Sequence, residues 1–228
     1  MTAPSPMFVA FARWAMRRRA RRQLDGIHVA GLDRVRARLS GGPLVMAANH
    51  VGWWDGPSMI LVDEALGADG RVVVDAPSLR SFPFFRWLGA IPLDRSTPMA
   101  MRGAFTSART ALSGPGRTLW FFPQGRERPS WVRPLGFGRG HEVLGRHAPI
   151  VPVAISYAYR GGPCPAAFVH LGDVVPAAEV ESAVVDGLAA IDRHLELGDG
   201  AFVTIVAGAV RRPEAEFGTR LLAGVSRA

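Results

Sequence analysis

The most chemically suggestive stretch of the chain holds a histidine and an aspartate five positions apart, His50 and Asp55. The apolar run at residues 43–48 predicts a strand before Asn49-His50, and a helix is predicted from Pro57. A histidine at such a turn can take and return a proton near neutral pH. A carboxylate bonded to its other ring nitrogen fixes the tautomer and stabilises the imidazolium. The pair is therefore a candidate general base with its orienting partner; the alternative is a helix-capping aspartate beside an unrelated histidine.

The composition is that of one globular domain with a basic surface. The chain has 228 residues, of which 48% are hydrophobic, enough for a substantial core. The formal net charge is +8, and because the sequence contains no lysine every basic side chain is arginine. The arginines crowd residues 13–22 and 126–146, and such clusters attract nucleic acid or anionic lipid. No recognised nucleic-acid motif accompanies them, so we expect no nucleic-acid partner.

The N-terminal segment predicts an amphipathic helix over residues 7–22. Phe8, Phe11 and Trp14 share one face, and arginines fill the following turns. Such a helix suits the surface of an anionic bilayer; the alternative is a helix packed on its own domain with a solvated basic end. No apolar run reaches the 18 or so residues that a membrane-spanning helix requires. We therefore expect a membrane-surface helix at residues 1–26 and a single domain at residues 27–228.

Strands and helices alternate along the rest of the chain. Apolar segments predict strands at residues 27–30, 43–48, 71–75, 89–95, 117–122, 150–155 and 167–171, and helices are predicted at residues 31–39, 57–66, 99–112, 141–146 and 180–197. The span from residue 201 to the end fits either a strand or a helix. This alternation predicts an α/β fold with a mixed, mostly parallel sheet flanked by helices. The aromatic segment at residues 78–88 is expected in the core; the alternative is a membrane-facing or acyl-contacting surface. His28 is expected to be exposed.

Four short motifs accompany the strands, and we expect them at the strand ends, where α/β sheets bind ligands. They are Asn49-His50-x4-Asp55, Gly89-x-Ile91-Pro92-x-Asp94-Arg95, Phe122-Pro123-Gln124-Gly125 followed by Arg126 and Arg128, and Val151-Pro152-Val153. In this order and spacing the set resembles the glycerolipid acyltransferase family, which includes the lysophosphatidate acyltransferases. The resemblance covers residues 27–175.

The resemblance implies a membrane-associated enzyme that moves an acyl group from a thioester to a lipid hydroxyl. The donor would be acyl-CoA or acyl carrier protein as a co-substrate, with no bound cofactor and no metal. The acceptor implied is lysophosphatidate or a related lysophospholipid. His50 would deprotonate the hydroxyl while Asp55 orients it, a contribution of about 10² to 10⁴-fold, and backbone N–H groups around Gly125 would stabilise the oxyanion. The location implied is peripheral, on the anionic cytoplasmic face of a membrane; the single cysteine, Cys164, fits a reducing compartment.

The resemblance also implies a set of substrate-binding residues. These are Asn49, Arg95, Gln124, Gly125, Arg126 and Arg128. The planar guanidinium of Arg95 suits bidentate contact with a phosphate. Either Arg126 or Arg128 takes the place of the family's arginine in the third motif, and the alternative for all three is surface salt bridging to Asp94 or Glu127.

The third motif departs from the family at one position, because Gln124 stands where the family has glutamate. The change keeps the size of the side chain and removes its charge. It leaves open an acceptor without phosphate, such as a glycosylated terpenoid or carotenoid lipid. It also leaves open a non-catalytic lipid-binding relative, against which the retention of His50 and Asp55 argues.

Overall fold

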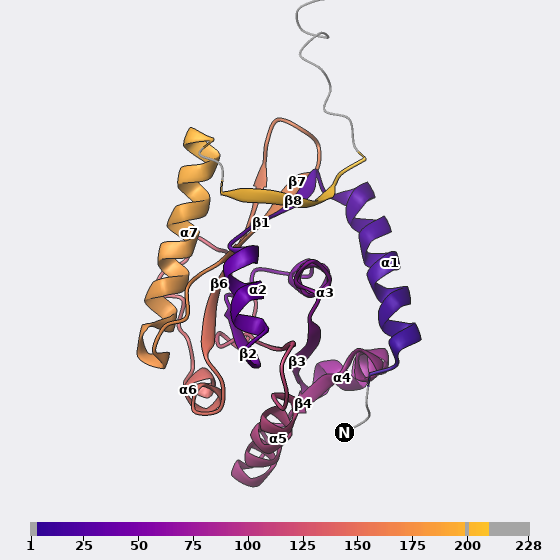
Figure 1. Cartoon of the computed structure of the whole chain (residues 1–228), viewed down its shortest axis with the longest axis vertical. Helices are drawn as coiled ribbons and strands as arrows, with labels where there is room; N and C mark the ends of the chain where they lie inside the picture. The colour runs from indigo at the N-terminus through magenta and orange to yellow at the C-terminus, as the bar shows by residue number, and fades with distance from the viewer. Residues whose placement is uncertain (1–3, 199–200, 210–228) are drawn as a thin grey trace, which may run out of the picture.

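A single eight-stranded sheet forms the centre of the computed structural model, which describes residues 4–198 and 201–209 (Figure 1). The strands are β1 (Gly26–Ala30), β2 (Leu44–Ala48), β3 (Asp69–Asp75), β4 (Ala90–Leu93), β5 (Arg117–Phe121), β6 (Ile150–Tyr159), β7 (Pro165–Leu171) and β8 (Phe202–Ala207). Their order across the sheet is β4-β3-β5-β2-β6-β7-β1-β8. Only the β6–β7 and β1–β8 pairs among these strands are antiparallel. The predicted mixed, mostly parallel α/β fold is confirmed.

Helices cover both faces of the sheet. They are α1 (Pro6–Gln23), α2 (Leu32–Leu39), α3 (Asp55–Leu66), α4 (Ala76–Ser81), η1 (Pro83–Leu88), α5 (Pro98–Ala111), α6 (Gly140–Gly145), η2 (Ala177–Glu179) and α7 (Val180–Leu197). Side chains of α1, α2 and α3 share one core cluster, and those of α5, α6 and α7 pack in the clusters of the other face. Figure 1 shows α1 and α7 on opposite sides of the molecule.

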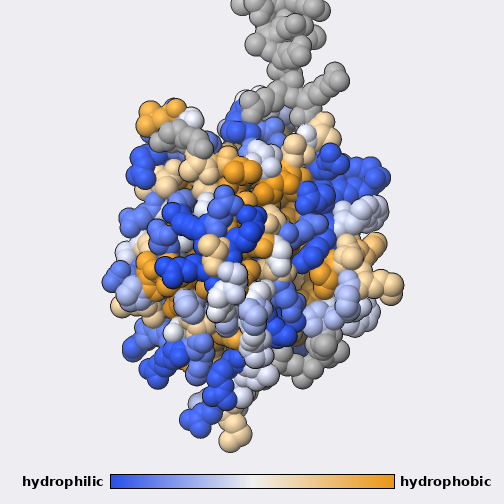
Figure 2. Space-filling model, in the orientation of Figure 1, coloured by the Kyte–Doolittle hydropathy of each residue, from blue (hydrophilic) through white to orange (hydrophobic). Residues whose placement is uncertain are grey.

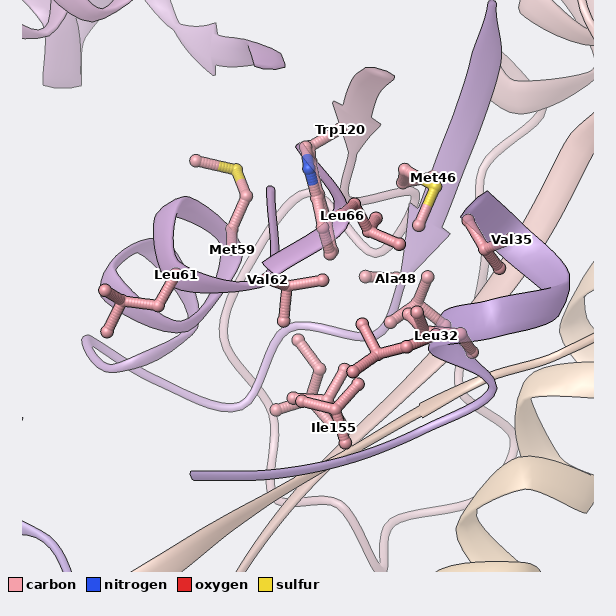
Figure 3. Close-up of a cluster of buried hydrophobic side chains, with 14 of the residues drawn as sticks. Leu32, Val35, Met46, Ala48, Met59, Leu61, Val62, Leu66, Trp120 and Ile155 are labelled. Atoms are coloured by element: carbon pink, nitrogen blue, oxygen red, sulfur yellow. The ribbon is translucent and has the colours of Figure 1, made fainter. Parts of the chain in front are cut away.

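The largest core cluster lies where α2 and α3 meet the middle of the sheet. Val35 of α2 and Val62 of α3 pack with Met46, Trp120 and Ile155 from β2, β5 and β6 (Figure 3). All five residues of β2 are buried, because helices cover this central strand on both sides. The end of β2 is thereby anchored in the core.

One carboxyl group, Asp63 of α3, is buried in this region. Its Oδ1 accepts hydrogen bonds from Thr118 Oγ1 at 2.7 Å and from Trp120 Nε1 at 3.0 Å. Burial raises the pKa of Asp63 to about 7, although these hydrogen bonds and the charge of Arg13 act in the opposite direction.

Helix α1 packs on the domain with one face and exposes another. Ala20 is buried, Arg13 Nη2 donates to the carbonyl of Ala68 at 3.1 Å, and Arg17 pairs with Glu64 at 2.8 Å. The exposed side chains of the helix include Met7, Phe11 and Trp14. In Figure 2 the helix runs along the right side, with a blue arginine-rich half and a paler, more apolar half. Within the described residues, no helix combines the length and the hydropathy needed to cross a membrane.

The expectation that residues 78–88 lie in the core is wrong. Leu79 is buried, but Phe82, Phe84 and Trp87 are 53%, 41% and 53% exposed. This segment folds into α4 and η1 beside the start of α1, where the ring of Phe8 meets the ring of Trp87 at 5.1 Å between centroids. Aromatic content alone could not distinguish an interior segment from an apolar surface.

The expectation that His28 is exposed is also wrong. Strand β1 lies between β7 and β8, and the His28 ring stacks on Phe168 at 4.9 Å between centroids. The ambiguous span after residue 201 forms strand β8 over Phe202–Ala207, and residues 210–228 lie outside the described part of the chain.

Candidate active site

The His50 turn, residues 49–55, joins the end of β2 to the start of α3. His50 Nδ1 lies 2.6 Å from Asp55 Oδ2. The Asp55 side chain is fully buried, whereas the His50 side chain is 28% exposed. Because Nδ1–H donates to the carboxylate, Nε2 carries the lone pair that can accept a proton.

Asp55 is held by main-chain and side-chain donors. Its Oδ2 also accepts hydrogen bonds from the N–H groups of Val51 at 2.6 Å and Gly52 at 3.0 Å. Its Oδ1 accepts from the hydroxyl of Tyr157 at 2.6 Å. A buried carboxylate requires such donors to offset its lost hydration. Together they fix the orientation in which Asp55 meets His50.

Tyr157 is a site residue that the sequence reasoning missed. The predicted strand ended at Ile155, but β6 continues to Tyr159 and carries Tyr157 to the turn. Burial, and then the negative charge of Asp55, raise the pKa of Tyr157 well above its ordinary value, so the hydroxyl remains a donor. The alternation of Val153, Ile155 and Tyr157 predicts a longer strand, but it does not predict the contact with Asp55.

Asn49 fastens the turn to β6. Its Oδ1 accepts from the N–H of Ile155 at 2.7 Å, and its Nδ2 donates to the carbonyl of the same residue at 2.9 Å. The side chain is buried at 1% exposure. This predicted substrate-binding residue therefore lies beneath the turn, with both ends of its amide bonded to the sheet.

Gln124 makes a similar two-sided contact on the other side of His50. Its Oε1 accepts from the His50 N–H at 2.5 Å, and its Nε2 donates to the carbonyl of Leu135 at 2.9 Å. The N–H of Arg128 donates to the His50 carbonyl at 2.8 Å. The ring of Phe122 lies 4.8 Å from the His50 ring. The third motif therefore encloses His50 from the side of β5.

Gly125 brings the second and third motifs together. Its φ of +65° favours glycine, and a Cβ there would lie 2.8 Å from Nη2 of Arg95. Arg95 is half exposed and faces Asp75 at 3.8 Å. The Gly125 N–H donates to the carbonyl of Phe122 at 3.0 Å, so this group is already used within the turn.

The structure separates the two arginines that follow Gly125. Arg126 is exposed, whereas Arg128 is half buried and bonded to the His50 turn through its N–H. The guanidinium of Arg128 also reaches the carbonyl of Leu135 at 3.4 Å. Only Arg128 of the pair therefore has a described contact with the turn.

The fourth motif is not at the end of its strand, so that expectation is wrong. Residues 151–153 begin β6, and Val153 pairs with Ala48 at the end of β2. Their buried side chains support the site from below. The residues that reach the turn come later in the same strand.

The bulky Trp53 of the turn meets α1. Its ring is 53% exposed, and the guanidinium of Arg19 lies over it at 4.3 Å from the ring centroid. Trp54 is half buried and packs against the core. Among the described residues, no group of three or more His, Cys, Asp or Glu side chains could hold a metal ion.

A comparison with protein-family models gives a match that spans the site. The family model described as Acyltransferase matches residues 26–156, more than half of the chain, and its span includes the His50 turn, Arg95 and Gln124. No curated protein matches the chain. The match supports a lipid acyltransferase function. The chain therefore belongs to the Acyltransferase family, and the protein is an acyltransferase enzyme.

Proposed function

We propose that the protein transfers a fatty acyl group from acyl-CoA or acyl carrier protein to the hydroxyl of lysophosphatidate or a related lysophospholipid. The observation that carries this proposal is the contact between the partly exposed His50 side chain and the buried Asp55. The dyad has the geometry of a general base and requires no nucleophilic side chain of the protein.

In the proposed reaction, Nε2 of His50 takes the proton of the acceptor hydroxyl. The oxygen attacks the thioester carbonyl, and a tetrahedral intermediate forms. Collapse of this intermediate breaks the C–S bond, and the imidazolium returns its proton to the departing thiolate. The products are an ester and a free thiol, and Asp55 stabilises the imidazolium between the two proton transfers.

Arg95 supports a phosphate-bearing acceptor. Its guanidinium lies against Gly125, next to the segment that contacts His50, and it is half exposed. The carboxylate of Asp75 at 3.8 Å is a loose partner, which an acceptor phosphate can replace with a bidentate contact. Arg128 supplies a second positive charge beside the turn.

The catalytic proposal is tested by thiol release from palmitoyl-CoA with lysophosphatidate as acceptor. We expect His50→Ala to lose at least 100-fold in kcat, in line with the general-base contribution of about 10² to 10⁴-fold. His147→Ala is the matched control, because this histidine is exposed and lies outside the turn. Equal turnover by His50→Ala and the wild type would overturn the proposal. If the enzyme turns over a lysophospholipid that lacks a phosphomonoester and does not turn over lysophosphatidate, the acceptor is reassigned to the former.

We also propose that the enzyme works peripherally on the anionic, cytoplasmic surface of a membrane. Two aromatic segments support this, α1 with Phe11 and Trp14 and η1 with Phe84 and Trp87, all exposed. The contact of Phe8 with Trp87 joins the two segments into one surface. Arginines follow directly in the second half of α1, as anionic headgroups would require.

Vesicle sedimentation tests the membrane proposal. We expect binding to vesicles with anionic phospholipid, weaker binding at high salt, and a loss of at least tenfold in partitioning for Trp14→Ser combined with Trp87→Ser. Leu197→Ser is the matched control, because Leu197 is 72% exposed on α7, on the opposite side of the molecule (Figure 1). Unchanged partitioning of the double variant would contradict the proposal.

A further inference from the structure

We propose that Gln124 is a positioning residue that fixes the main chain of His50 and that its neutral amide is required for this role. The inference rests on the proposed function, in which His50 is the general base. It differs from a role in binding substrate, because the two polar ends of the side chain are already bonded to the protein.

The two partners of Gln124 have opposite polarity. The His50 N–H is a donor, so it requires an oxygen, and the Leu135 carbonyl is an acceptor, so it requires an N–H. An amide supplies both groups, and its length spans the gap between the turn and residue 135. Gln124 therefore ties two backbone segments together as a short bridge.

A glutamate cannot form the same bridge. One carboxylate oxygen would still accept from the His50 N–H, but the other would face the Leu135 carbonyl oxygen at the position where Nε2 now lies, 2.9 Å away. The guanidinium of Arg128 donates to the same Leu135 carbonyl at 3.4 Å. A carboxylate would attract the guanidinium of Arg128. The Leu135 carbonyl would lose the N–H donor that the Gln124 amide now supplies.

The placement of His50 depends on this bridge. Its neighbour Asn49 is bonded to Ile155 on one side, and His50 itself is bonded to Gln124 and Arg128 on the other. The imidazole is thus set by its own backbone as well as by Asp55. Removal of the Gln124 bond frees the His50 N–H while the contacts to Asp55 remain.

Three variants test the assignment with palmitoyl-CoA and lysophosphatidate as substrates. Gln124→Met keeps the length and removes both hydrogen bonds, and Gln124→Glu keeps one. We expect both to lower kcat about tenfold, with the KM for lysophosphatidate within about twofold of wild type. Thr110→Val, which removes a hydrogen bond on the exposed part of α5, is the matched control and is expected to keep wild-type values.

Amide hydrogen exchange of a peptide that contains residues 49–52 supplies a readout independent of turnover. We expect faster exchange at this turn in Gln124→Met, which loses the bond to the His50 N–H, with the peptides of β2 unchanged. A rise in KM for lysophosphatidate with unchanged kcat would overturn the assignment in favour of substrate contact, and so would unchanged exchange. If the wild type fails to turn over this pair while the exchange difference is seen, the proposed function fails and the positioning assignment stands.

Discussion

The buried carboxyl group of Asp63 makes folding stability depend on pH in a direction that can be calculated. Its pKa is about 7 in the folded protein, against an ordinary value of 3.8. Between pH 3.8 and pH 7, Asp63 is therefore protonated in the folded state and ionised in the unfolded chain. The free energy of unfolding falls as pH rises through this window and levels off above pH 7.

These two pKa values give the size of the effect. Between pH 5 and pH 8 the wild type is expected to lose about 2 to 3 kcal/mol of stability through Asp63 alone. Asp63→Asn keeps an oxygen acceptor for Thr118 and Trp120 and cannot ionise, so it should remove this loss. The variant is thus expected to be more stable than the wild type at pH 8.

Urea unfolding at pH 5 and pH 8 measures the effect as a difference of differences. Other groups titrate in the same range; burial lowers the pKa of His170, for example, which works in the opposite direction. The comparison of wild type with Asp63→Asn cancels these contributions. Asp186→Asn, on an exposed position of α7, is the matched control and should behave as wild type does. The quantity compared is the change in the free energy of unfolding between pH 5 and pH 8. If this change differs by less than about 0.5 kcal/mol between wild type and Asp63→Asn, the reasoning is refuted.

Two further predictions concern the site. Tyr157→Phe leaves Oδ1 of the buried Asp55 without its hydroxyl donor, so we expect a loss of about 1.5 to 3 kcal/mol in the free energy of unfolding, together with lower kcat; an unchanged melting temperature would contradict this. Gly125→Ala places a Cβ against Arg95 at a positive φ, so we expect a several-fold higher KM for lysophosphatidate and little change in KM for palmitoyl-CoA. Equal changes in both KM values would show that Arg95 has no special relation to the acceptor.

Much of the architecture could be read from the sequence because its signals are local. The apolar run before His50 predicted β2, and Pro57 lies in the first turn of α3. The alternation of strands and helices predicted the sheet. The spacing of His50 and Asp55 was informative because both lie on one strand-to-helix turn, where local geometry decides the contact.

The features that the sequence did not show depend on tertiary contacts. Tyr157 meets Asp55 across 102 positions of the chain, and the partners of Gln124 are backbone groups that look the same for every residue type. The exposure of Trp87 depends on which surface the fold leaves uncovered, and the burial of His28 depends on β8, which arrives from the end of the chain.

Strand β6 determines which changes of length the chain can tolerate. It begins beside β2 in the core and then passes the His50 turn, where Ile155 meets Asn49 and Tyr157 meets Asp55. Because successive residues of a strand point to opposite faces, one inserted or deleted residue after Val153 would turn Tyr157 away from Asp55. Single-residue insertions and deletions between Val153 and Tyr157 are therefore expected to break the contact with Asp55, even at positions where substitutions are tolerated.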